Sequence, residues 1–262
     1  MKIVTWNVNS VRLRLDLVER LTDELAPDVV CLQETKCPDD LFPHEALTRL
    51  GWEHVACHGQ KGYNGVAILS RRPLREVRTQ AWCGRPDCRH LIAEVDGMEV
   101  HSLYIPAGGD EPDPEKNPKF ANKLRFLDEL TEWFAASYGP RDPLVLAGDF
   151  NVAPLPTDVW DHRKLLKVVT HTPMETTRLA LLQQTLGWID TTRAFVPPDE
   201  HVFTWWSYRA ADWRGANKGR RLDHVWITPA LADRLCGWEV HVDARDWPQP
   251  SDHAPVAAVL RE

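Results

Sequence analysis

The sequence predicts a single α/β domain that spans residues 1–262. Short apolar runs rich in β-type residues alternate along the whole chain with runs whose apolar residues recur at helical spacing. No linker, fixed-period repeat or low-complexity stretch divides these runs. The composition, with 43% hydrophobic and 26% charged residues, is that of a soluble globular protein and excludes intrinsic disorder and collagen-like repeats.

The pattern of apolar residues predicts each element in turn. The predicted strands, in chain order, are Lys2–Trp6, Asp28–Leu32, Gly65–Ser70, Leu91–Val95, Val100–Ile105, Leu144–Ala147, Leu222–Ile227, Cys236–Val242 and Pro255–Leu260. The predicted helices, each with apolar residues at helical spacing, are Val11–Leu25, Ala121–Ala136 and Arg178–Leu186. Asp96-Gly97 is typical of a hairpin turn, and the Pro- and acid-rich segment Gly108–Lys119 is predicted to be a surface loop.

The sequence also indicates where in the cell the protein is expected and which partners its charge favours. No run approaches the roughly 18 apolar residues of a membrane helix, and the first residues resemble a strand instead of a signal peptide, so we expect a cytoplasmic protein. The six cysteines form no Cys-x-x-Cys pair and are expected to be reduced. The net charge of -7 argues against binding nucleic acid through bulk charge, although it leaves room for a local basic strip.

Polar residues gather at the ends of predicted strands. They are Asn7 and Asn9, Gln33 and Glu34, Asp149 and Asn151, Asp223, and Ser251, Asp252 and His253. Binding sites in layered α/β folds are commonly built at strand ends, where a rigid scaffold meets open loops. Because side chains two residues apart on a strand share a face, Asp149 and Asn151 are expected to point into one cleft.

This mixture of side chains suits a particular chemistry. Carboxylates with neutral amides form an all-oxygen set that favours Mg²⁺ or Mn²⁺ and has too few Cys or His for zinc. Asn7 and Asn151 could donate hydrogen bonds to the oxygens of a phosphate ester, while Glu34 holds a metal that neutralises developing charge. Asp223 beside His253 suits a carboxylate that orients an imidazole.

Each residue taken alone also has a simpler explanation. The asparagines and Asp149 are common turn residues, Glu34 could cap a helix, and Asp252 could be a helix N-cap. Five polar strand ends in one domain nevertheless favour a shared site over five unrelated turns. A serine hydrolase is excluded because Ser251 lies in no Gly-x-Ser-x-Gly elbow, and the chain has neither a phosphate-binding Gly-x-x-x-x-Gly-Lys loop nor a Gly-x-Gly-x-x-Gly motif.

The motifs together resemble those of the exonuclease III family of abasic-site endonucleases, within the endonuclease/exonuclease/phosphatase superfamily. The resemblance runs from Lys2 to about Leu260 and is carried, in the family's order, by Thr5-Trp6-Asn7-Val8-Asn9-Ser10, Leu32-Gln33-Glu34-Thr35-Lys36, Gly65-Val66-Ala67-Ile68-Leu69-Ser70, Gly148-Asp149-Phe150-Asn151-Val152-Ala153-Pro154, Arg221-Leu222-Asp223 and Ser251-Asp252-His253-Ala254-Pro255-Val256. It implies a four-layer α/β/β/α sandwich with two packed mixed sheets.

The resemblance also implies a role for each site residue. Glu34 would be the principal ligand of Mg²⁺, for which Mn²⁺ may substitute, and Asp149 would orient or deprotonate the attacking water. His253, paired with Asp223, and Asn151 would contact the scissile phosphate. Tyr104 matches the family's active-site tyrosine, as a phenolate or as a hydrogen-bond donor. The full set of expected metal ligands is Asn7, Glu34, Asp149, Asn151, Asp252 and His253.

Aromatic and cationic residues before Asp223 suit contact with DNA. We expect Trp206 and Arg209 to contact DNA and Trp205 and Leu222 to form the pocket for the abasic sugar; burial of the aromatics in the core is the alternative. Lys61 and Asn64 are expected to touch phosphate, with a turn as the equal alternative.

Two features depart from the family. An acidic Pro-rich loop follows Ala107-Gly108-Gly109 where the bacterial prototype has a polar segment that contacts DNA. Arg220 stands where the human abasic endonuclease has a tryptophan, so that wall of the pocket must differ.

These observations predict a Mg²⁺-dependent DNA repair nuclease. Its expected substrate is double-stranded DNA, cut on the 5′ side of abasic sites and trimmed at 3′ ends, with no membrane and no obligate protein partner. A phosphodiesterase or phosphatase acting on RNA or on a small phosphate ester is the first alternative. A catalytically silent DNA-binding module is the second.

Overall fold

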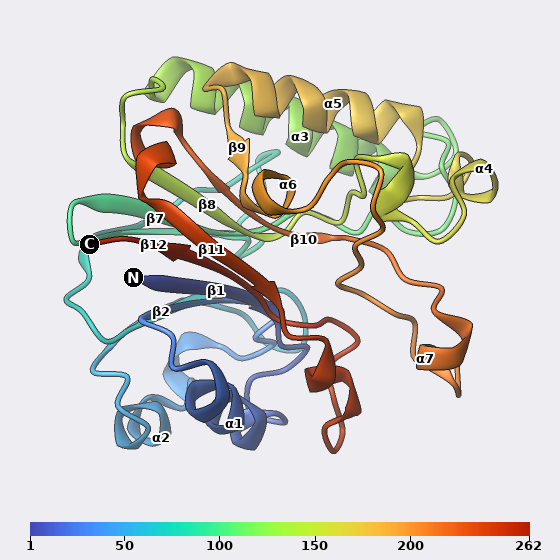
Figure 1. Cartoon of the computed structure of the whole chain (residues 1–262). Coiled ribbons are helices and arrows are strands. Elements are labelled where there is room, and N and C mark those ends of the chain that lie inside the picture. Colours follow the sequence, from blue (N-terminus) through green and yellow to red (C-terminus); the bar gives the residue numbers. More distant parts are fainter.

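The computed structural model describes residues 1–262 and forms four layers, with two sheets packed face to face between two layers of helices (Figure 1). The first sheet has the strand order β11 (Leu235–Val240), β12 (Val256–Leu260), β1 (Lys2–Asn7), β2 (Val29–Gln33), β4 (Val66–Ser70) and β3 (His54–His58). The second has the order β5 (Arg75–Thr79), β6 (His90–Val95), β7 (Met98–Tyr104), β8 (Leu144–Asp149), β10 (Asp223–Ile227) and β9 (Ile189–Asp190). The pairs β1–β2 and β7–β8 are parallel and the other neighbours are antiparallel, so both sheets are mixed, as predicted.

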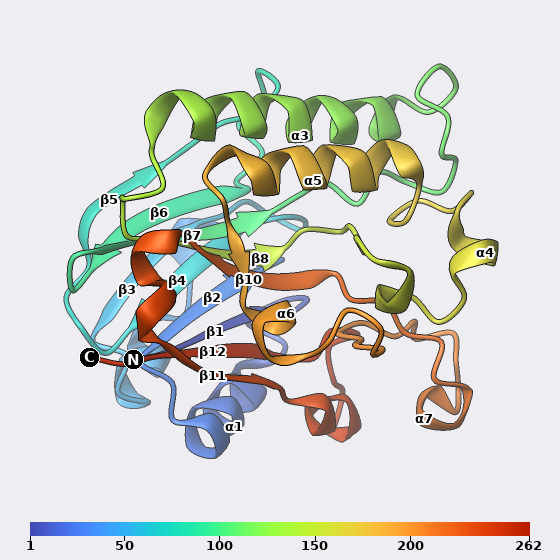
Figure 2. The same cartoon turned by 45° about the horizontal axis from the view of Figure 1, so that its top comes forward.

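Helices cover the outer face of each sheet. The longer ones are α1 (Leu15–Leu25) and α2 (His44–Arg49) on the first sheet, and α3 (Pro118–Ser137) and α5 (Pro173–Thr185) on the second. The short helices α4 (His162–Leu165), α6 (Thr191–Phe195) and α7 (Trp213–Ala216) lie in the connections, and Figure 2 shows α4 and α7 projecting from the same side of the molecule. None of the helices has the length and apolar character needed to cross a lipid bilayer.

The alternation of side chains along each strand builds the core. Ile3 points into the layer between the sheets, whereas its neighbour Val4 packs under α1 on the outer face. In β8, Val145 faces the layer between the sheets and Leu146 packs under α3. This period of two continues to the ends of the strands and decides which polar residues face inward there.

Most predicted elements are confirmed, and the differences have local causes. Asp96 and Gly97 form the expected two-residue hairpin turn, both with positive φ. The first helix begins at Leu15, four residues after its predicted start, because the backbone N–H of Val11 donates to Thr35 O instead of entering the helix.

Other differences reflect signals that hydrophobic periodicity does not carry. Helix α5 begins at Pro173, five residues early, where Thr172 and Glu175 form a capping box. The strands β3 and β5 were not predicted because their residues are half-buried and exposed, respectively, and show no alternation.

Candidate active site

Three strands of the second sheet bring polar side chains to one edge of the layer between the sheets. Asp149 ends β8 and pairs in register with Tyr104 of β7 on one side and with Asp223 of β10 on the other. All three residues are in phase with inward-facing core residues of their strands, so their side chains face the first sheet. Gly148 allows the close approach of β7 and β8, because a Cβ there would collide with the carbonyl of Leu103.

Asn7 of β1 joins the two sheets at this edge. It is fully buried, and its side-chain amide donates to Glu34 Oε1 and to Asp149 Oδ2, both at 2.9 Å. Its own Oδ1 accepts from the backbone N–H of Asn9 at 3.1 Å. Asn7 therefore holds two carboxylates from different sheets next to each other, as the clustering of polar strand ends predicted.

Glu34 is a partly exposed carboxylate, with 20% of its side chain accessible. Lys36 Nζ lies 2.9 Å from Glu34 Oε2, and Tyr104 donates to Glu34 Oε1 at 2.8 Å. Burial alone would raise the pKa of Glu34, but the hydrogen bonds from Asn7, Lys36 and Tyr104 hold it below its ordinary value. Glu34 is therefore ionised at neutral pH, as a metal ligand must be.

The protonation state of Tyr104 follows from its surroundings. Its side chain is buried, and burial raises its pKa well above the ordinary value, reinforced by the charges of Glu34 and Asp149. These surroundings favour the neutral phenol, which donates its proton to Glu34 Oε1.

His253 bridges two carboxylates. Its Nδ1 donates to Asp223 Oδ2 at 2.9 Å, and its Nε2 lies 3.7 Å from Asp149 Oδ2. Burial by itself would lower the pKa of His253, but the attraction of Asp223 and Asp149 outweighs it and raises the pKa to about 10. Burial in turn raises the pKa of Asp149 above its ordinary value.

Asn151 follows β8 in a strained conformation. Its φ of 51° lies in the left-handed region, and Glu34 has a φ of 50°, which is uncommon for residues other than glycine and is found at functional sites. Asn151 is held by its side-chain amide, which donates to Asp149 Oδ2 at 3.1 Å, and by Lys123 Nζ, which donates to the Asn151 carbonyl at 2.7 Å.

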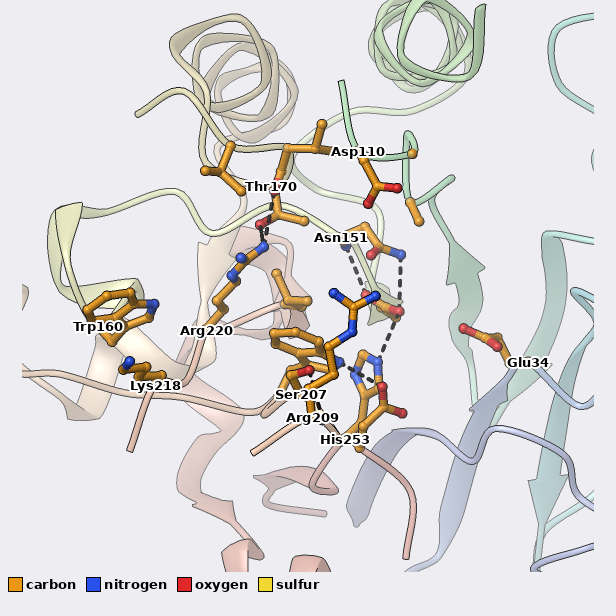
Figure 3. Close-up of a pocket in the computed structure, with 18 of the residues that line it drawn as sticks. Glu34, Asp110, Asn151, Trp160, Thr170, Ser207, Arg209, Lys218, Arg220 and His253 are labelled. Carbon is orange, nitrogen blue, oxygen red and sulfur yellow. Dashed lines mark hydrogen bonds and ion pairs between the residues drawn. The ribbon is translucent and has the colours of Figure 1, made fainter. Parts of the chain in front are cut away.

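These groups open into a cavity of about 560 Å³ (Figure 3). One side of it is formed by the polar strand ends, and Figure 3 shows Trp160, Lys218 and Arg220 on the side away from Glu34. The cavity is lined by Glu34, Tyr104, Ala107, Gly109, Asp110, Asp149, Asn151, Trp160, Val168, Val169, Thr170, Trp205, Ser207, Arg209, Lys218, Arg220, Leu222, Asp252 and His253. It therefore contains most of the predicted site residues.

The donor set fits a hard divalent cation. The carboxylates of Glu34, Asp149 and Asp252 all line the cavity and offer the oxygen ligands that Mg²⁺ and Mn²⁺ prefer. Ligand atoms of His253, Asp149 and Asp223 all lie within 4.8 Å of one another, and His253 would ligate an ion there as the neutral imidazole, because an imidazolium has no free lone pair. Asn7 presents its N–H groups to the carboxylates, so it would ligate an ion only with its amide turned over.

The predicted DNA contacts divide into three groups. Trp205, Arg209 and Leu222 line the cavity, where they are accessible to a ligand. Trp206 is a correction, because it is buried, donates its indole N–H to Asn217 at 3.1 Å and does not line the cavity. Asn64 is buried and lines a second depression beside Tyr104, whereas Lys61 is exposed and lines neither.

Three supporting residues were not singled out from the sequence. Lys36 pairs with Glu34, Lys123 holds Asn151, and Thr204 Oγ1 donates to Asp223 Oδ2 at 2.6 Å. Lys36 lies two residues after Glu34 inside the motif Leu32-Gln33-Glu34-Thr35-Lys36, which was the signal available for it. Lys123 and Thr204 are distant in sequence from the residues that they contact, so only the folded chain brings them to the site.

The fold and site define a metal-dependent hydrolase of layered α/β type, and the similarity to known proteins agrees. A sequence model of the endonuclease/exonuclease/phosphatase family matches residues 4–253, so the chain belongs to that family. Exodeoxyribonuclease III of Haemophilus influenzae is 29% identical over 276 residues, which cover 100% of both chains.

Solved structures are similar over the whole chain. An AP endonuclease from Archaeoglobus fulgidus superposes with a TM-score of 0.92 at 33% identity and covers 99% of both chains. A 3′ phosphatase from Neisseria, bound to a product DNA hairpin, superposes with a TM-score of 0.91 at 36% identity and covers 100% of both chains. The predicted exonuclease III family and its fold are therefore confirmed, and so is the prediction of an enzyme.

Proposed function

We propose that the chain is a Mg²⁺-dependent DNA repair nuclease that hydrolyses the phosphodiester on the 5′ side of abasic sites and also removes nucleotides or blocking groups from 3′ ends. The observation that carries this proposal is the joined network of Glu34, Asn7, Asp149, Asp223 and His253, of which Glu34, Asp149 and His253 line a cavity with aromatic and cationic walls. Similarity to nucleases along the whole chain supports it.

Each residue of the network has a separate role in phosphodiester hydrolysis. Glu34, Asp149 and Asp252 would hold Mg²⁺, which supplies positive charge to the developing phosphorane oxygens. Asp149 accepts a proton from the attacking water, a role that its raised pKa favours. The His253 imidazolium donates to a phosphate oxygen, and Asp223 keeps His253 protonated and oriented. The Tyr104 phenol donates its one proton to Glu34 and so orients that carboxylate.

The surroundings of the site favour a polymeric substrate over a small phosphate ester. A second depression of about 640 Å³ lies on the other side of Tyr104 and is lined by Arg85, Arg89 and Lys119, among others. Cations thus flank the polar strand ends on both sides, which suits a phosphate backbone that crosses the site. A small ester would use neither flank.

One experiment separates the candidates. A duplex with a tetrahydrofuran abasic analogue, the same duplex intact, a single-stranded RNA and p-nitrophenyl phosphate are each incubated with enzyme and Mg²⁺ or with EDTA. Metal-dependent incision 5′ to the analogue supports the proposal, and turnover of only RNA or the small ester favours the alternative. Binding of the abasic duplex without any incision favours the silent binding module. Glu34→Gln is the matched control for contaminating nucleases.

A further inference from the structure

Arg220 carries a charge that no protein group neutralises. Its guanidinium lines the cavity and lies 5.2 Å over the ring of Trp205. One Nη donates to the carbonyl of Val169 at 3.1 Å and to Thr170 Oγ1 at 2.8 Å, whereas the other Nη has no partner in the protein and no carboxylate lies within ion-pair distance.

The acidic group whose charge acts on Arg220 is already paired. Glu175 contributes to the electrostatics of Arg220, but its carboxylate is buried and bonded to Lys123 Nζ. Because a half-buried cation without a counter-ion is costly, the position of Arg220 favours an anionic ligand.

A second cation stands beside it. Lys218 lines the same side of the cavity, with its Nζ 5.1 Å from the centre of the Trp160 ring (Figure 3). No ion pair joins Lys218 to a carboxylate in the protein. The polar strand ends collect negative charge at one end of the cavity, and Lys218 and Arg220 collect positive charge at the other.

Trp205 connects the two ends. Its indole N–H donates to Asp252 Oδ2 at 2.9 Å on the catalytic side, and its ring lies under Arg220 on the far side. Together with Leu222 it forms an apolar wall between them. A sugar held against this wall with its 5′ phosphate near His253 would have Arg220 on its opposite side, because Trp205 lies between Asp252 and Arg220.

We propose that Arg220 and Lys218 form a second phosphate subsite, which binds the phosphate on the 3′ side of the sugar whose 5′ phosphate is cleaved. This inference rests on the proposed function. It defines the preferred substrate class as a sugar with phosphate on both sides, as at an internal abasic site, in preference to a terminal nucleotide with a free 3′ hydroxyl.

The test changes one charge on the substrate and one on the protein. Two duplexes carry the same tetrahydrofuran abasic analogue and the same scissile phosphate; the linkage immediately 3′ of the analogue is a phosphodiester in one and an uncharged methylphosphonate in the other. The kcat/KM of each is measured with Mg²⁺ for the unmodified protein, Arg220→Leu, Arg220→Lys and Arg163→Leu. Arg163 is exposed on α4 and does not line the cavity, so its variant controls for general electrostatics.

We expect the unmodified protein and Arg163→Leu to prefer the phosphodiester about tenfold, the scale of one charge-assisted hydrogen bond. Arg220→Leu should lose that preference, cutting both duplexes at the rate at which the unmodified protein cuts the methylphosphonate, and Arg220→Lys should keep part of it. Circular dichroism and thermal melting establish that the variants fold. An unchanged preference in Arg220→Leu, or faster cleavage of both duplexes, would overturn the subsite.

The proposal of a phosphate subsite can be tested independently of the proposed function. If the unmodified protein cuts neither duplex, the proposed function fails, but metal-free binding of the same two duplexes, followed by fluorescence anisotropy, still reports on Arg220. Tighter binding of the phosphodiester duplex that disappears in Arg220→Leu supports the subsite, and equal binding of both duplexes rejects it.

Discussion

Replacement of Lys123 tests whether a buried ion pair outside the cavity positions the catalytic residues. Lys123 and Glu175 are both fully buried and paired. Lys123 Nζ also donates to the carbonyl of Asn151 at 2.7 Å and to that of Ala107 at 3.3 Å. Lys123→Met keeps much of the side-chain volume and removes the charge and all of these hydrogen bonds.

The expected loss of stability follows from what remains around Glu175. Removing one partner of a buried ion pair costs about 3–5 kcal/mol, because the other charge is left without compensation. Glu175 would still accept hydrogen bonds from the N–H of Thr170 and from the N–H and hydroxyl of Thr172, so we expect the lower end, about 3 kcal/mol. For a chain of this size, this corresponds to a fall in Tm of roughly 6–12 °C.

Activity should fall as well, because the Asn151 carbonyl loses the donor that holds its left-handed backbone. The assay combines urea unfolding with single-turnover incision of an abasic duplex at saturating Mg²⁺, at a temperature where the variant is folded. Lys116→Met is the control, since Lys116 lies on the surface with a side chain that is 74% exposed. The double variant Lys123→Met/Glu175→Gln should recover part of the lost stability.

Two results would refute this reasoning. A change in unfolding free energy below about 1 kcal/mol would mean that the ion pair does not stabilise the fold. A destabilised variant with unchanged single-turnover rate would mean that the pair supports the fold without positioning Asn151.

Three further outcomes are expected. Glu34→Gln should abolish Mg²⁺-dependent turnover with a change in Tm of no more than a few degrees, and substantial activity in purified protein would remove Glu34 from the ligand set. Asp223→Asn and His253→Gln should each lower kcat about a hundredfold. The loss in the double variant should be smaller than the product of the two single losses, because the residues act as one unit. A loss equal to that product would mean that Asp223 and His253 act independently. Burial lowers the pKa of His224 to about 4, so at this residue the unfolded chain binds an extra proton between about pH 6.5 and pH 4, and the contribution of His224 to stability should fall by roughly 3 kcal/mol as the pH falls through this window. The difference in unfolding free energy between the unmodified protein and His224→Gln, measured by urea unfolding from pH 8 to pH 4, isolates this contribution from that of Asp149, whose raised pKa acts in the opposite direction; a difference that does not change with pH would contradict it.

The buried strands around the site and the cluster of site residues were predictable because both follow a period of two. The inward-facing apolar residues of β8, Val145 and Ala147, are in phase with Asp149, so the pattern that places the core also aims the carboxylate. The sequence motifs then indicated which strand ends belong together.

Irregular segments carry no such period. Trp205 and Trp206 are adjacent, yet the first lines the cavity and the second is buried against Trp213 with its ring centre 5.1 Å away. Composition alone could not distinguish them. Likewise, Lys123 lies on a helix as an ordinary lysine, and only the packing of α3 against α5 brings it to Glu175 and Asn151.

The distribution of charge explains how a chain with a net charge of -7 can act on DNA. At physiological ionic strength, interactions between exposed charges are largely screened beyond about 8 Å, so the field at the site depends on neighbouring groups and only weakly on the total. Arg209, Lys218 and Arg220 line one flank of the polar strand ends, and Arg85, Arg89 and Lys119 line the other. The acidic centre attracts a divalent cation and would repel a phosphate without it, while the cationic flanks attract the adjoining phosphates. With a divalent cation held at the centre, as proposed, productive placement of the backbone would depend on that metal, and substrate position would be coupled to catalytic competence.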